Sequence, residues 1–155
     1  MATIKYDEIT SSLYSKIEAY DFLELSSDEL HDFLVSWLHT AVSKPYVRKL
    51  FSSITLKDEI ISVDYEMKNS IDEETDREFV IEILALGIGI QWLTPKINST
   101  TNINQMYGSK EEKYYSQSSH LSELRSLKKD WVKEQRGMIR DRGYIWNSYL
   151  NGDQS

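Results

Sequence analysis

The chain has 155 residues, of which 40% are hydrophobic and 28% charged, and its net charge is −7 at pH 7. This length and composition are typical of one globular domain with a sizeable core, and they argue against a disordered chain. The chain has no cysteine, which excludes disulfides and thiolate metal sites. The first residues, MATIKYDEITSSLY, have no basic start followed by an apolar run, so we expect no signal peptide.

The first predicted element is a helix over about residues 4–18. Ile9, Leu13, Ile17 and Tyr20 recur at three- and four-residue spacing, which places them on one face of a helix. This face should pack into the core.

A second helix is predicted over about residues 27–43. Ser26 and Glu29 match a capping box, in which the hydroxyl accepts a hydrogen bond from a free backbone N–H and the carboxylate reaches back. Pro45 disfavours helical geometry at the residue before it and should end the helix. The apolar stripe consists of Leu30, Phe33, Leu34, Trp37, Leu38, Ala41 and Val42.

Alternating apolar and polar residues follow, and they predict a small β-hairpin over about residues 53–67. An isolated hairpin is marginally stable in water, so we expect it to pack on the helices or on a neighbouring subunit. The alternating apolar residues are Ile54, Leu56, Ile61, Val63, Tyr65 and Met67.

The run Phe79–Leu93 is apolar almost all the way round a helix and lies within a predicted helix over about residues 73–96. Such a helix is either buried on every side or embedded in a membrane. The run is about 15 residues long, whereas a membrane span needs roughly 20. We therefore expect a buried central helix. Gly87 and Gly89 should allow close helix contacts, and Pro95 should end or kink the helix.

A polar segment over residues 98–110 is predicted to be a loop, followed by a last helix over about residues 119–147 that Ser118 or Ser119 could cap. Gly137 and Gly143 could kink this helix. Taken together, the predicted elements indicate a mainly α fold. We expect a single domain built as a four-helix-type bundle, with a buried central helix and a small β-hairpin.

Charge is unevenly distributed along the chain. Residues 1–85 carry 18 acidic and 8 basic side chains, whereas residues 119–150 carry 7 basic and 4 acidic ones. These could be solvated faces that simply differ. Alternatively, an acidic and a basic surface on one molecule favour head-to-tail contacts between copies.

The last helix combines basic and aromatic residues. It could be a core helix with a charged outer face or a protein interface that uses aromatic and arginine anchors. Nucleic-acid binding is disfavoured by the negative net charge. The candidate interface residues are Arg125, Lys129, Trp131, Lys133, Arg136, Arg140, Tyr144 and Trp146.

No pattern of residues predicts catalysis, a cofactor or a metal. Asp28, His31 and Asp32 have a spacing that could ligate a metal, but a site needs three or four convergent ligands and the chain offers no second set. The acidic residues 72–78 lack the spacing and central glycine of a calcium-binding EF-hand loop, and they are explained by the preference of helix N-termini for negative charge. We therefore expect no enzyme.

Three segments carry a resemblance to a known family. They are residues 33–38 (FLVSWL) with Ala41 and Val42; residues 82–87 (EILALG) with residues 91–97 (QWLTPKI); and Tyr115-Ser116 followed by residues 121–125 (LSELR). Their layout resembles the head–tail connector proteins of tailed phages, also called adaptor, head-completion or neck proteins, particularly those of Gram-positive hosts.

The resemblance implies a structural protein of the virion neck that is assembled in the host cytoplasm. Such subunits form a ring, expected to have twelve copies, which joins head to tail and extends the DNA channel. The implied partners are further copies of the chain, the portal protein, and stopper or tail proteins. DNA would pass without sequence-specific binding, and no membrane is involved. An acidic N-terminal half would suit the channel lining.

A second reading of the same sequence is a small acidic intracellular protein of the immunity or inhibitor type. Such a protein would be a stable monomer or dimer that binds a basic partner one to one. The two readings differ in whether copies of the chain associate into a ring.

Overall fold

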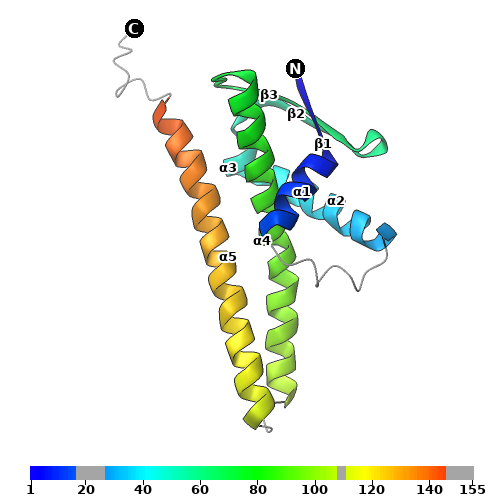
Figure 1. Cartoon of the computed structure of the whole chain (residues 1–155), viewed down its shortest axis with the longest axis vertical. Helices are drawn as coiled ribbons and strands as arrows, with labels where there is room; N and C mark the ends of the chain where they lie inside the picture. Colours follow the sequence, from blue (N-terminus) through cyan, green and yellow to red (C-terminus); the bar gives the residue numbers. More distant parts are fainter. Residues whose placement is uncertain (17–26, 108–110, 146–155) are drawn as a thin grey trace.

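The computed structural model describes the backbone of residues 1–16, 27–107 and 111–145, and the side chains of residues 1–16, 28–98 and 121–144. It is mainly helical, with a small antiparallel sheet at one end (Figure 1). The helices are α1 (Tyr6–Lys16), α2 (Ser27–Ser43), α3 (Pro45–Arg48), α4 (Glu73–Tyr107) and α5 (Glu111–Ile145). The mainly α fold with a buried central helix is confirmed.

The sheet contains β1 (Ala2–Lys5), β2 (Phe51–Lys57) and β3 (Ser62–Met67) in the order β1-β3-β2. The predicted hairpin is β2 and β3, joined by the short 3₁₀ helix η2 (Asp58–Ile60). The prediction of a helix from residue 4 is wrong at its start, because residues 2–5 form β1, a strand that was not predicted. Ile4 is fully buried opposite Val63, while Thr3 faces outward and donates a hydrogen bond to Asp64.

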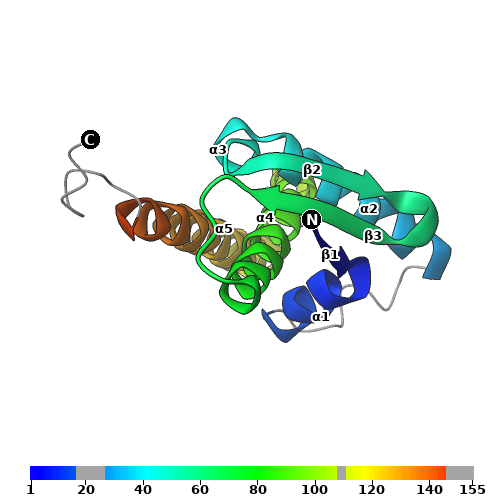
Figure 2. The ribbon, with the colours of Figure 1, turned by 90° about the horizontal axis from the view of Figure 1, so that it is seen from above.

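Helix α4 is the centre of the fold, and α1, α2 and α5 all pack on it. Figure 2 shows α5 on one side of α4, and α1 and α2 on the other. From Ile83 to Ile90, every residue of α4 is buried. Residues Glu73–Asn98 are long and apolar enough to span a membrane by length and composition alone, but 61% of their most apolar 18-residue window is buried inside the protein. Buried core helices have this same composition.

The two glycines of α4 are contact points for its neighbours, as predicted. A Cβ atom at Gly87 would lie 2.8 Å from the Cβ of Ala41 on α2. A Cβ at Gly89 would lie 2.7 Å from the ring of Trp131 on α5 and 3.2 Å from Leu13 on α1. The missing side chains therefore let three helices approach α4 within one turn.

The predicted loop over residues 98–110 is wrong wherever the structure describes it, because α4 continues through Pro95 to Tyr107 and α5 begins at Glu111. Ser118 and Ser119 thus lie inside α5 and do not cap it. Proline removes one backbone hydrogen bond from a helix. Here α4 and α5 run side by side along this stretch (Figure 1), and we attribute the continuation of α4 to that pairing. Residues 108–110 and the predicted cap Ser26 lie outside the described residues.

Candidate functional site: a basic groove beside the last helix

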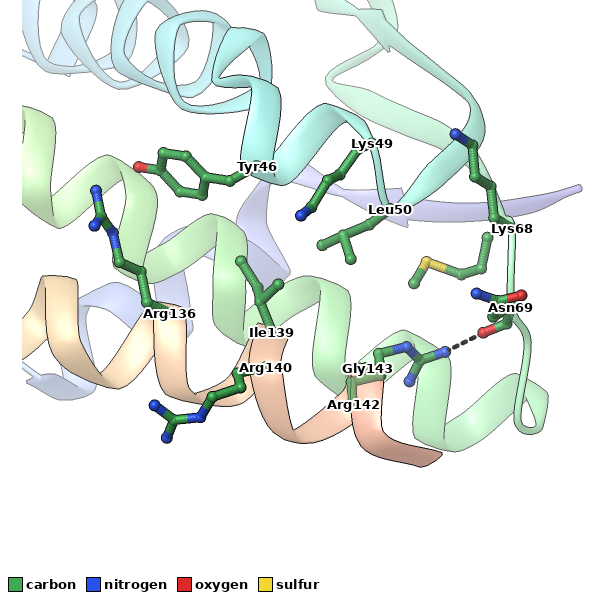
Figure 3. A pocket seen from close by; sticks show the side chains of 11 residues that line it. Tyr46, Lys49, Leu50, Lys68, Asn69, Arg136, Ile139, Arg140, Arg142 and Gly143 are labelled. Carbon is green, nitrogen blue, oxygen red and sulfur yellow. Dashed lines mark hydrogen bonds between the residues drawn. The ribbon is translucent and has the colours of Figure 1, made fainter. Parts of the chain in front are cut away.

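A groove of about 690 Å³ lies where three parts of the chain meet. These parts are α3 with the two residues that follow it, the end of β3 with the two residues after it, and the C-terminal half of α5 (Figure 3). The hairpin brings the first two together, because Phe51 pairs with Met67 at its base. The groove is lined by Tyr46, Lys49, Leu50, Met67, Lys68, Asn69, Arg136, Ile139, Arg140, Arg142 and Gly143.

The charged lining of this basic groove is entirely positive, with two lysines and three arginines and no acidic residue. Lys49 and Lys68 are exposed, and among the described residues their ammonium groups have no ion-pair partner. Arg136 lies over the ring of Tyr46, 5.3 Å from its centroid. Arg140 has only an exposed contact of 3.7 Å with Asp141. Surface pairs of this kind contribute little, so the groove retains its positive charge.

Arg142 differs from the other four cations because it is already paired inside the protein. It is buried, and its guanidinium donates to Asp76 at 2.5 Å and to the backbone oxygen of Asn69 at 2.8 Å. The guanidinium also stacks over Phe79, 4.6 Å from the ring centroid. This contact fastens the end of α5 to the start of α4 and forms one wall of the groove.

Asp76 is held in its ionised form by the same contacts. Burial alone would raise the pKa of its carboxyl group, but hydrogen bonds from Ser70, from Arg142 and from the backbone of Ile71 outweigh burial. The net effect is a pKa below the ordinary value. The pair of Asp76 and Arg142 is therefore ionised at neutral pH and is a structural part of the groove.

The floor of the groove is apolar. Leu50 and Ile139 are partly buried and pack against the main core, and Met67 belongs to that core. A groove with an apolar floor and a cationic rim is suited to a ligand that combines an apolar side chain with an acidic group. This combination is found in protein segments.

The hairpin turn, residues 58–61, lies on the other side of α4 from α5 (Figures 1 and 2). Asp58 accepts a hydrogen bond of 2.5 Å from the hydroxyl of Tyr6 and contacts His39 at 2.8 Å. The hydrogen bond from Tyr6, followed by the contact with His39, holds the pKa of Asp58 below its ordinary value. The backbone N–H of Tyr6 also donates to the oxygen of Ile61 at 2.9 Å. The turn is thus fixed to α1 and α2.

Two isoleucines of this turn face solvent: Ile60 is 65% exposed and Ile61 is 43% exposed. Ile61 also has a positive φ of 54°. A β-branched residue in this conformation is unusual and costs about 1–3 kcal/mol. The strain lies at the residue that ends η2, where the backbone N–H of Ile61 donates to the oxygen of Asp58 and closes the turn.

The predicted interface residues on α5 divide between two faces. Arg136 and Arg140 line the groove, and Lys133 is exposed on the same helix. Tyr144 is 52% exposed near the end of α5. Trp131 does not belong to the exposed face: it is only 5% exposed and packs against Trp92, with ring centroids 6.5 Å apart.

The remaining predicted residues lie away from the groove. Arg125 and Lys129 border a smaller depression, of about 360 Å³, beside Ile97. Trp146 lies outside the described residues. Asp28, His31 and Asp32 are exposed at the start of α2, and over the described side chains no group of three or more His, Asp or Glu residues is placed to hold a metal.

Lys49 and Lys68 were missed by the sequence analysis, although a signal for them existed. A hairpin brings together the residues just before its first strand and those just after its second strand. The predicted hairpin therefore placed the chain around residue 49 beside the chain around residue 68. What the sequence did not indicate was that the end of α5 completes the site.

The function of the basic groove has to be inferred from its own chemistry and from the sequence resemblance. No protein-family model, no curated protein and no solved structure matches this chain. The phage connector family accordingly remains an expectation from the sequence.

Proposed function

We propose that this protein is a structural subunit of the neck of a tailed phage. Copies of it form a ring at the portal that joins the head to the tail and extends the DNA channel. Two things support the proposal: the resemblance of three helical segments to head–tail connectors, and the distribution of charge and apolar surface over the folded chain.

The observation that carries the proposal is the placement of two unlike surfaces on opposite sides of α4. The basic groove lies beside α5, and the hairpin turn with Glu59 and its two exposed isoleucines lies on the far side (Figure 2). A molecule with two different, complementary faces associates head to tail, and such contacts generate rings when the rotation between copies closes. A dimer with a two-fold axis would instead use one self-complementary face.

The long helical pair supports the same role. Beyond Lys96, α4 continues to Tyr107, which adds about 16 Å at the rise of an α-helix. Together with α5, this stretch projects away from the sheet and from α1 and α2 (Figure 1). In a ring, a projecting pair from every copy would form a collar that adjoining neck or portal proteins can contact.

Deletion of the gene from a phage that carries it tests the proposal. We expect DNA-filled heads and separate tails that do not join, and joining should be restored when purified protein is added to the extract. The gene should also lie between the major capsid gene and the tail genes. Normal virions from a phage that lacks the gene would instead favour the alternative, a small acidic intracellular protein of the immunity or inhibitor type. A stable one-to-one complex of the free protein with a basic partner would favour the same alternative.

A further inference from the structure

We propose that the hairpin turn of one copy docks into the basic groove of the next copy. This inference rests on the proposed ring and names the contact that builds it. The turn consists of residues 58–61, and the groove is the one at the base of the same hairpin in a neighbouring molecule.

The two surfaces are complementary in charge. Within the described part of the chain, Lys49 and Lys68 in the groove have no ion-pair partner, and the same is true of Glu59 in the turn. An interface that places Glu59 among these cations neutralises charges that the isolated subunit leaves unpaired. Complementary charge also suppresses wrong partners and fixes the register of docking.

The two surfaces are also complementary in apolar area. Ile60 is 65% exposed at the tip of the turn, the largest exposed fraction of any described large hydrophobic side chain apart from Met1. The groove offers Leu50, Met67 and Ile139 as its floor. An apolar anchor that enters a pocket surrounded by polar contacts is the usual anatomy of a protein interface.

The turn is already held in one shape before it binds. Asp58 is fixed by Tyr6 and His39, so it belongs to the support of the turn and leaves Glu59 and Ile60 as the contacting residues. The helical turn η2 and the left-handed Ile61 project the tip beyond the strands. A rigid segment loses little conformational entropy on docking, which strengthens binding without additional contacts.

One hairpin carries both halves of the contact. The groove is at the start of β2 and the turn is at its end, and the seven residues of this strand span about 20 Å. The turn therefore cannot reach the groove of its own molecule. Each copy offers a turn to one neighbour and a groove to the other, so the contact repeats from copy to copy.

A nucleic acid is the other class of ligand that a cationic groove could hold. The apolar floor and the net charge of −7 favour a protein segment. Phosphate binding depends on an excess of positive charge over the whole contact surface, and it needs no apolar anchor. Binding of DNA in the groove is accordingly an outcome that the experiment must be able to reveal.

Disulfide trapping tests the contact directly, because the chain has no cysteine of its own. In the full chain, Ile61→Cys places one thiol on the turn and Gly143→Cys places another at the groove, so Glu59, Ile60 and the cations of the groove all stay in place. The double variant is oxidised at high protein concentration and low salt. A disulfide needs Cα atoms about 4.4–6.8 Å apart, so a bond between these positions can form only between two molecules.

We expect the double variant to give a ladder of linked trimers, tetramers and larger species on a non-reducing gel, whereas each single variant stops at dimers. The matched control combines Ile61→Cys with Lys133→Cys, which lies on the same helix outside the groove. The control pair should form its disulfide-linked ladder several-fold more slowly than the test pair. In 1 M salt, the test pair should form its ladder at a rate close to that of the control pair.

Equal ladders from the test and control pairs would overturn the inference. Saturable binding of a short DNA duplex that blocks trapping at Gly143→Cys would also overturn it. The outcome is separable from that of the gene deletion. If heads fail to join tails without the protein but no specific ladder forms, the neck role stands and this contact is wrong. If the ladder forms but joining is unaffected, the contact stands and the phage role is wrong.

Discussion

The two faces of α5 place their polar residues in different surroundings. On the inner face, Gln135 donates to the backbone oxygen of Ile83 at 2.9 Å and Arg142 pairs with Asp76. On the outer face, Arg136 and Arg140 border the basic groove. The polar groups of the inner face bind to residues of α4, whereas the two arginines of the outer face are exposed to solvent. Substitutions on the two faces should therefore affect different measurements.

The largest effect is expected from a charge placed in the centre of the inner contact. Ile83 is fully buried, so Ile83→Glu removes its apolar contacts and buries an unpaired carboxylate. We expect a loss of several kcal/mol, which is comparable with the whole stability of a domain of this size. Circular dichroism should show no cooperative melting. The exposed control Lys133→Glu should melt like the wild type, and a folded Ile83→Glu protein would contradict the central place of α4.

The buried ion pair should give the next largest effect. Arg142→Met leaves the carboxylate of Asp76 buried without its partner, and breaking such a pair typically costs about 3–5 kcal/mol. Urea unfolding measures this loss. Arg140→Met, two residues earlier on the exposed face, should change stability by less than about 0.5 kcal/mol. Adding Asp76→Asn to Arg142→Met should recover part of the loss, and no recovery would mean that Arg142 acts through packing alone.

Replacing a glycine by alanine should change the free energy of unfolding by a smaller amount. The sign of the change depends on the atoms that surround the glycine. Gly89→Ala places a Cβ 2.7 Å from the Trp131 ring, so strain should exceed the gain in helix propensity and destabilise the protein by about 1–2 kcal/mol. Gly143→Ala in α5 meets no atom within 4 Å and should stabilise by up to about 1 kcal/mol. Thermal melting compares the two variants. Equal shifts would refute the close approach at Gly89.

Acid should weaken the inner contact gradually. Because the folded protein holds the pKa of Asp76 below its ordinary value, this group stabilises the fold at pH values above about 4, the pKa of an unfolded aspartate. That contribution is lost as the pH falls through the lower, folded pKa. Urea unfolding between pH 7 and 3 should show a shallower decline for Asp76→Asn than for the wild type. A residual decline is expected, because the pKa values of Glu8, Asp58 and Asp64 are also lowered.

Elements with a strong local pattern could be predicted from the sequence. Helix α2 begins and ends where the apolar stripe and Pro45 indicate, and the hairpin follows the alternation of residues 53–67. Strand β1 was missed because four residues give too little periodicity, and it is their pairing with β3 that makes them a strand. The extension of α4 past Pro95 was missed because its pairing with α5 outweighs the local preference of proline.

The candidate site was predictable in part. The charge on α5 identified Arg136 and Arg140, since runs of basic residues are visible in any sequence. Trp131, one of the candidate interface residues, is buried, and its seven-residue spacing from Leu124 and Met138 is typical of a core position. The groove itself depends on the place where the hairpin base meets α5, and that meeting is set by tertiary packing.

The proposed ring requires copies of this chain to associate head to tail, and native mass measurement of the concentrated protein at low ionic strength detects that association. We expect one dominant species at a high multiple of the 18.2 kDa subunit, and Glu59→Lys should convert it to monomer. A wild-type protein that stays at 18.2 kDa, or that stops at a dimer insensitive to Glu59→Lys, would contradict the proposed ring.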